Sequence, residues 1–289
     1  MEILFFCPRW GSEDIPWDDF CHKVKTAGYQ GIEYAIARGV SDGELINAWT
    51  SADKYGLLMI PQHYDTVEAD FKAHFRIYKT WLDRVSQLPN VLINSQAGKD
   101  FFTFAQNREL IELGNSYKVL HETHRGKFSF AAHITQPFLE QIPDLRLTFD
   151  VSHWVNVAES LLEDQEETVQ LAIAKADHIH ARVGYAEGPQ VSDPRSRTWE
   201  NELAKHQAWW DAIFMRKLRV GERLTITPEF GPFPYMVHLQ KDGSPIANQW
   251  DCNLHMMKIL KDRYTTLLSS QTKWDAGSAV GTTVSHENP

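Results

Sequence analysis

The sequence predicts a single (β/α)₈ barrel, and three observations carry this prediction. Eight short β-rich runs alternate with amphipathic helical stretches, which is the pattern of a parallel sheet with helical crossovers. The chain has 289 residues, close to the roughly 250 that such a barrel needs. A doubly wound open sheet is the main alternative, but it usually has a Gly-rich first turn. Here the first run is followed by Pro8-Arg9-Trp10-Gly11.

The eight strand candidates are residues 2–7, 31–36, 57–62, 90–95, 117–122, 146–151, 178–183 and 223–230. Helical periodicity fills the gaps, as in residues 18–28, where Phe20 and Val24 share one side and Gly28 is a stop signal. We therefore predict a barrel domain over residues 1–268. The small, polar residues 269–289 predict a C-terminal extension that is flexible or docks on a partner.

Charge and cysteine content narrow the class of protein. The formal net charge of −9 argues against a partner with a phosphate backbone, so we expect no nucleic acid. Cys7, Cys21 and Cys252 fit neither a disulfide framework nor a CxxC metal motif, which indicates reduced, buried thiols in a cytoplasmic protein. The sequence shows no signal peptide and no run of 18 apolar residues, so we expect no membrane partner either.

Four consecutive strand candidates end in a carboxylate or an imidazole. Glu122 ends the fifth, Asp150 lies near the end of the sixth, His180 lies on the seventh, and Glu229 lies near the end of the eighth. In a parallel barrel these ends meet at the same rim. Taken singly, such a Glu or His is more often an ordinary loop or core residue. Together they predict a shared divalent cation, because desolvated carboxylates repel one another unless a cation holds them.

The seventh strand requires a choice of ligand. His178, His180 and Arg182 share one face, since strand side chains alternate. His180 lies nearer the rim, so we predict that it binds the metal and that His178 supports it from below. Three oxygen donors and one nitrogen donor suit Mn²⁺, our first expectation, and also Mg²⁺ or Co²⁺, with Zn²⁺ as a further alternative.

These motifs resemble the xylose isomerase-like barrel superfamily, in particular the sugar phosphate isomerase/epimerase group that includes the D-tagatose and D-psicose 3-epimerases. The resemblance covers about residues 1–268 and rests on Asp150-x-x-His153, His178-x-His180, Glu122 and Glu229. It implies that Glu122, Asp150, His180 and Glu229 hold one metal ion, that Glu122 and Glu229 are the catalytic acid/base pair, and that His153 binds substrate oxygens.

The chain departs from the epimerase pattern at two positions. The epimerases carry a further Glu six residues after the first metal Glu, and Phe128 stands there in this chain. They carry a substrate-binding Arg six residues after the metal His, whereas here position 186 is Ala and Arg182 follows His180 by two. These departures leave open a lyase that uses the same site.

Several further residues are candidates for substrate binding. His63, Trp10 and Trp154 end strands, and the two Trp rings could stack on a sugar. Arg125, Arg182 and Gln190 could bind a charged or glycosidic group. Each has a structural alternative, namely core packing for His63 and the Trp residues and a surface ion pair for the loop residues. Most of the ten Trp are expected in the core or at the interface of a homo-oligomer.

The resulting hypothesis is a metal-dependent sugar isomerase or epimerase that moves a proton next to the carbonyl of a ketose or keto-sugar. A lyase or dehydratase acting on a keto-sugar or 3-keto-glycoside is the closest alternative. A hydrolase similar to endonuclease IV and a non-enzymatic binding protein are weaker alternatives. The partner that we expect is a small carbohydrate.

Overall fold

The computed structural model describes the backbone of residues 1–278 and the side chains of residues 1–269. Within this part, eight parallel strands close into a barrel in sequence order. The strands are β1 (Ile3–Pro8), β2 (Gly31–Ala35), β3 (Leu58–His63), β4 (Ile93–Ser95), β5 (Val119–Glu122), β6 (Leu147–Phe149), β7 (Ala176–His180) and β8 (Leu224–Thr227). The predicted (β/α)₈ fold is confirmed, with strand ends shifted by a few residues.

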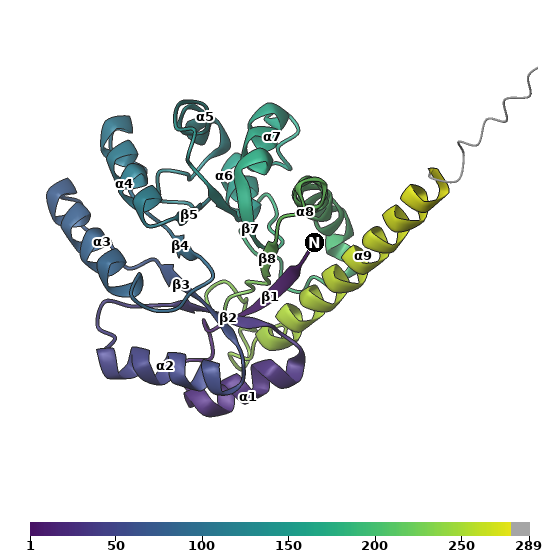
Figure 1. Ribbon diagram of the computed structural model, residues 1–289, viewed down its shortest axis with the longest axis horizontal. Helices are drawn as coiled ribbons and strands as arrows, with labels where there is room; N and C mark the ends of the chain where they lie inside the picture. The colour runs from purple at the N-terminus through teal and green to yellow at the C-terminus, as the bar shows by residue number, and fades with distance from the viewer. Residues whose placement is uncertain (279–289) are drawn as a thin grey trace, which may run out of the picture.

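The helices form an outer ring around the strands (Figure 1). They are α1 (Trp17–Ala27), α2 (Asp42–Lys54), α3 (Phe71–Val85), α4 (Phe104–Ser116), α5 (Ala132–Gln141), α6 (Val151–Ala158), α7 (Glu166–Lys175), α8 (Glu200–Val220) and α9 (Gln249–Ser278). Their ends follow the local sequence. Gly28 adopts φ 92° and ends α1 as predicted. Thr103 and Gln106 form a capping box that begins α4.

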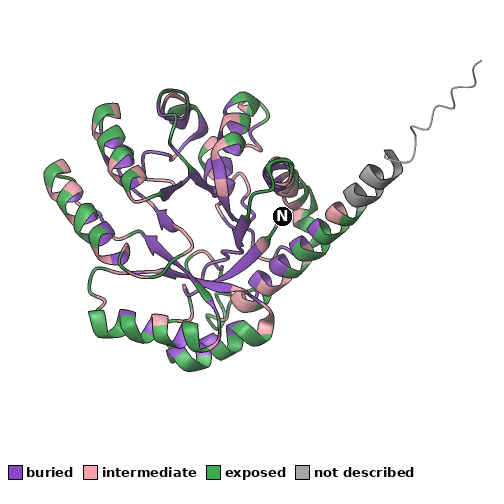
Figure 2. Cartoon of the chain, in the orientation of Figure 1, coloured by how far each residue is buried: buried purple, intermediate pink, exposed green. Residues whose placement is uncertain are grey.

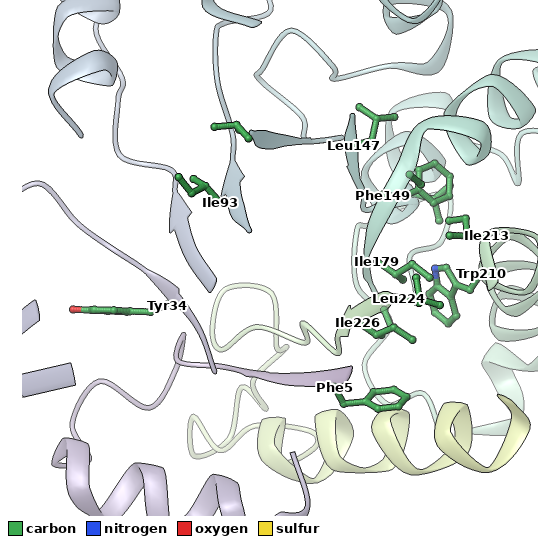
Figure 3. Close-up of a cluster of buried hydrophobic side chains, with 14 of the residues drawn as sticks. Phe5, Tyr34, Ile93, Leu147, Phe149, Ile179, Trp210, Ile213, Leu224 and Ile226 are labelled. Carbon is green, nitrogen blue, oxygen red and sulfur yellow. The ribbon is translucent and has the colours of Figure 1, made fainter. Parts of the chain in front are cut away.

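The main apolar core lies between the strands and the helices. The strands are buried almost throughout, and the exposed residues gather on the outward faces of the helices (Figure 2). Figure 3 shows Phe149 of β6 and Ile179 of β7 beside Trp210 and Ile213 of α8. These strand side chains point away from the barrel centre, so the alternate residues of the same strands point into it.

Inside the barrel, a small apolar cluster of Leu4, Phe6 and Ile60 fills the end from which the strands begin, with Val91 and Leu92 packed against it. The opposite end, where the strands finish, is lined by polar and charged side chains. The barrel is therefore a closed scaffold that presents its chemistry at the C-terminal ends of its strands.

The last part of the chain forms α9, which packs beside the barrel and continues to Ser278. The predicted boundary at residue 268 thus lies within a helix, and residues 279–289 of the predicted extension lie outside the described residues. The three cysteines are buried and unpaired, as predicted. Within the described part, none of the helices combines the length with the apolar character that crossing a bilayer requires.

Candidate metal centre and its pocket

Four side chains from consecutive strand ends converge in the barrel mouth. One ligand atom from each of Glu122, Asp150, His180 and Glu229 lies within 4.8 Å of the others, and all four residues are buried. His180 Nδ1 lies 3.0 Å from Glu229 Oε2, 3.6 Å from Glu122 Oε1 and 4.0 Å from Asp150 Oδ2. The sequence-predicted ligands therefore form one cluster whose donor atoms face a common point.

The cluster fits a divalent cation for two reasons. Glu122 Oε1 and His180 Nδ1 are buried and accept or donate no hydrogen bond among the described residues. Such unpaired buried atoms are rare unless another group satisfies them. In addition, the buried carboxylates of Glu122, Asp150 and Glu229 share the barrel mouth with a single guanidinium, that of Arg182. A divalent cation would offset the remaining negative charge.

Glu33 of β2 belongs to the candidate site and was not among the residues predicted from the sequence. Its carboxylate lies 3.1 Å from His180 Nε2 and 3.2 Å from His178 Nε2, and it accepts hydrogen bonds from Asn94 Nδ2 and Thr227 Oγ1. A carboxylate on Nε2 holds the proton there and leaves His180 Nδ1 free as a ligand. The sequence contains an indication of this site residue, because a Glu within the apolar run GIEYAI is unusual.

The prediction for His178 agrees with this arrangement. Its Nδ1 lies 2.7 Å from Thr225 Oγ1, one layer below His180, and the two imidazole rings are 5.2 Å apart. The ring is fully buried and positions Glu33 rather than facing the pocket. It therefore belongs to the support of the cluster.

Three amide side chains, also missed from the sequence, hold Glu122. Its Oε2 accepts hydrogen bonds from Gln62 (3.3 Å), Asn94 (3.2 Å) and Gln96 (3.1 Å). Gln62 donates in addition to Glu229 Oε1 at 3.1 Å, so it bridges the two Glu residues. Each carboxylate is thereby fixed through one oxygen, and its other oxygen faces His180.

The pKa values of the cluster residues are shifted because their charged side chains are buried close together. Burial acts to raise the pKa of Glu122, but the positive charge of the nearby His180 outweighs burial and lowers the pKa to about 2. Burial raises the pKa of Asp150 to about 6, although Arg182 and His180 oppose the shift. Burial acts to lower the pKa of His180, but Glu229, Glu33 and Glu122 together raise it well above its usual value.

Arg182 and His153 lie at the edge of the cluster. Arg182 Nη2 donates to Asp150 Oδ2 and, at 2.8 Å, to His153 Nε2, and it lies 3.7 Å from Glu229 Oε2. Arg182 Nε donates to Ser152 Oγ at 3.2 Å. His153 Nδ1 is buried and has no hydrogen-bond partner among the described residues. Arg182 thus reaches the ligand Asp150, which its spacing from His180 alone did not reveal.

A pocket of about 510 Å³ opens above the cluster. Its lining includes Glu229 of the cluster and Arg182 at the edge of the cluster, with Gln62, Gln96 and His124 beside them. Its other walls come from Trp10, Glu13, Tyr34, Ala35, Ala37, Val40, Glu44, Tyr64 and Tyr235. A small molecule can therefore reach Glu229 and Arg182 from the C-terminal side of the barrel.

Trp10 and Tyr235 form one wall of this pocket. Their rings meet edge to face at 5.2 Å, and the Trp10 ring lies against Gly231, where a Cβ atom would stand 2.1 Å from it. Trp10 therefore lines the pocket, and its contact with a substrate stays a prediction. Arg125 does not line the pocket: it donates to Asn156 and lies over the Tyr235 ring, 5.1 Å from its centroid. In the structure Arg125 supports the Tyr235 ring, in place of the predicted contact with substrate.

Three other predicted substrate-binding residues face away from the pocket. Both ring nitrogens of His63 are engaged, by Ser95 Oγ at 3.0 Å and Thr66 Oγ1 at 2.7 Å, because alternation in β3 turns Gln62 inward and His63 outward. Trp154 is fully buried against Phe149 and donates to the Ser129 carbonyl. These two predictions are wrong, and core packing is the reason.

Gln190 is the third such residue. Its side chain is buried and pairs with the backbone of Gly231, accepting from the N–H at 2.7 Å and donating to the carbonyl at 3.2 Å. The predicted substrate contact is therefore replaced by a structural role. Gln190 fastens the loop after β7 to the segment that follows Glu229.

No protein-family model matches the sequence, and no curated protein matches it. Solved structures with some likeness include a truncated 3-deoxy-D-arabino-heptulosonate 7-phosphate synthase from Thermotoga maritima, at 14% identity and TM-score 0.36 over 78% of this chain and 89% of that chain. Another is a mandelate racemase/muconate lactonizing enzyme from a marine actinobacterium, at 14% identity and TM-score 0.44 over 83% and 59%.

A third is a dihydropteroate synthase from Thermus thermophilus, at 12% identity and TM-score 0.34 over 78% of this chain and 86% of that chain. All three likenesses are weak. Membership of the xylose isomerase-like superfamily stays a prediction.

Proposed function

We propose that this protein is a divalent-metal-dependent sugar isomerase or epimerase that transfers a proton next to the carbonyl of a ketose or keto-sugar. The observation that carries the proposal is the buried cluster of Glu122, Asp150, His180 and Glu229 at the floor of an open pocket. The bound cation, Mn²⁺ as first expectation, would polarise the carbonyl and make the neighbouring C–H more acidic.

Glu122 and Glu229 are the proposed proton carriers. They project from β5 and from the end of β8, and Gln62 holds one oxygen of each. A substrate lying between them would present opposite faces to the two carboxylates. One carboxylate can then remove a proton and the other can return one, which is the requirement for epimerisation.

Arg182 and His153 are proposed to bind and orient substrate oxygens. The Arg182 side chain lines the pocket and is held in place by Asp150 and Ser152. His153 Nε2 accepts a hydrogen bond from Arg182 Nη2 at 2.8 Å, so a shift of Arg182 toward a substrate oxygen would release His153 Nε2. Phe128, which stands where the epimerases carry a second Glu, is buried and packs against Phe138. No carboxylate from position 128 can therefore assist the pair.

The test is incubation of the protein with Mn²⁺ in D₂O and a panel of ketoses and 3-keto-glycosides. We expect deuterium in recovered substrate and product, without loss of mass from the carbon skeleton, and no exchange after chelation of the metal. Release of water or a glycosidic fragment would assign the same site to a lyase. Absence of both exchange and release across the panel would refute proton transfer.

A further inference from the structure

The walls of the pocket constrain the substrate beyond its reacting carbonyl, and the inference rests on the proposed function. We propose that the substrate is an uncharged keto-sugar with an apolar or aromatic second group, such as a glycoside, and not a phosphorylated sugar. Charge, shape and the pairing of Arg182 each favour this class of substrate.

Three carboxylates line the pocket. Glu229 lies at the floor, and Glu13 and Glu44 belong to the outer walls. Glu13 accepts two hydrogen bonds from the Gly11 N–H, at 2.9 and 3.0 Å, and Glu44 accepts one from the Tyr34 hydroxyl at 3.3 Å. Both outer carboxylates are therefore held beside the pocket. A phosphate placed above the floor would meet negative charge at either outer wall.

The pocket offers little to compensate a phosphate. Among the described lining residues, Arg182 alone carries a guanidinium or ammonium group. That guanidinium already donates to Asp150, His153 and Ser152. Sites that bind phosphate usually direct several unpaired cationic or backbone N–H donors at it.

The outer walls instead suit a flat or apolar group. The rings of Trp10, Tyr34, Tyr64 and Tyr235 line the pocket, together with Val40. The volume of about 510 Å³ is larger than one sugar ring requires and falls within the range of roughly 300–1,000 Å³ typical of larger ligands. A sugar whose carbonyl reaches the floor would leave its second group against these rings, where aromatic stacking is favourable.

The test compares three probes that share one ring: methyl 3-keto-β-D-glucopyranoside, its phenyl counterpart, and the methyl compound phosphorylated at O6. Calorimetric titration of the Mn²⁺-loaded protein gives their affinities. We expect the phenyl probe to bind about 3- to 10-fold tighter than the methyl probe, as one aromatic contact provides. We expect the phosphorylated probe to bind about 3- to 10-fold weaker, because the exposed carboxylates of Glu13 and Glu44 oppose it.

Two variants test which residues cause these differences in affinity. The double variant Glu13→Gln/Glu44→Gln should raise the ratio of phosphorylated to methyl affinity at least about 3-fold. Tyr64→Leu should reduce the advantage of the phenyl probe. The control Phe101→Leu removes an exposed aromatic ring outside the pocket lining and should leave both ratios unchanged.

The outcomes separate this inference from the proposed function. Equal or tighter binding of the phosphorylated probe, or no binding of any probe, overturns the inference, as does an unchanged ratio in the double variant. Deuterium exchange on these probes is measured in parallel. The predicted affinity order without exchange would support the substrate class and refute proton transfer. Exchange without that order would refute the substrate class and support proton transfer.

Discussion

The two ends of the barrel interior have opposite chemistry. Where the strands begin, Leu4, Phe6 and Ile60 form an apolar plug. Where they finish, Glu33, Glu122 and their partners form a buried charged cluster. The plug gains stability from removing apolar surface from water. The cluster costs stability unless its charges are compensated. One end of the barrel therefore maintains the fold, and the other holds the candidate site.

The largest expected effect comes from the charged end. Glu122→Gln or Glu229→Gln keeps the side-chain shape but removes a proton carrier, so the deuterium-exchange rate should fall about 10²- to 10⁴-fold. Thermal stability should stay the same or rise without metal, because one repelling charge is lost. Glu109→Gln, on the exposed side of α4, is the matched control. Retention of most of the exchange rate in Glu122→Gln would remove it from the acid/base pair.

The apolar end should respond in the opposite way. Phe6→Ala deletes a fully buried ring from the plug and should lower the free energy of unfolding by about 3–5 kcal/mol. The exchange rate per folded molecule should change little, since Phe6 belongs to the other end of the barrel. Urea unfolding and exchange assays on the same preparation measure both quantities. A loss of exchange that exceeds the loss of folded protein would contradict the separation of the two ends.

A third prediction concerns the pH dependence of stability and His206 of α8, in the helical layer outside the strands. Burial lowers the pKa of His206 to about 4, and its Nε2 accepts a hydrogen bond from the Gly184 N–H at 3.1 Å. Since the pKa in the folded state lies below the unfolded value of roughly 6.5, its contribution to stability is complete above about pH 6.5 and lost as pH falls toward 4. Between pH 6.5 and 5 this loss is about 2 kcal/mol.

His206→Gln, which can still accept the Gly184 hydrogen bond but does not titrate, isolates this contribution. Urea unfolding of both proteins at pH 7 and pH 5 should show a smaller pH dependence in the variant. His133→Gln, on the exposed surface of α5, is the matched control. Equal pH dependence in His206→Gln and the unaltered protein would show that His206 does not destabilise the fold in acid.

The last prediction concerns Glu33, which supports the cluster through His180. Glu33→Gln weakens the acceptor for His180 Nε2, so Mn²⁺ affinity should fall about 10- to 100-fold. Folding should be retained, because Asn94 and Thr227 can still bond to the amide. Calorimetric titration with Mn²⁺ measures the change, again with Glu109→Gln as control. Unchanged affinity would mean that Glu33 only balances charge.

The fold and the four proposed ligands followed from the sequence for one physical reason. The ends of parallel strands meet at a common rim, so a carboxylate or imidazole at the end of each of β5 to β8 had to converge once the barrel closed. Glu33 and Gln62 could have been found by the same reasoning, since both are polar residues on otherwise apolar strands. The direction of His63 was also open to prediction, because strand side chains alternate and Gln62 claims the inward position.

The barrel, its eight alternations of strand and helix, and the rim on which the carboxylates gather all follow from the sequence. These features depend on periodicity along the chain. Only the tertiary structure decided the partners: Glu33 on His180, Arg182 on Asp150, Gln190 on Gly231 and Arg125 over Tyr235. Each of these contacts joins side chains from different strands and loops. Their geometry depends on loop paths and rotamers that are set by packing across the whole barrel, which no local pattern encodes.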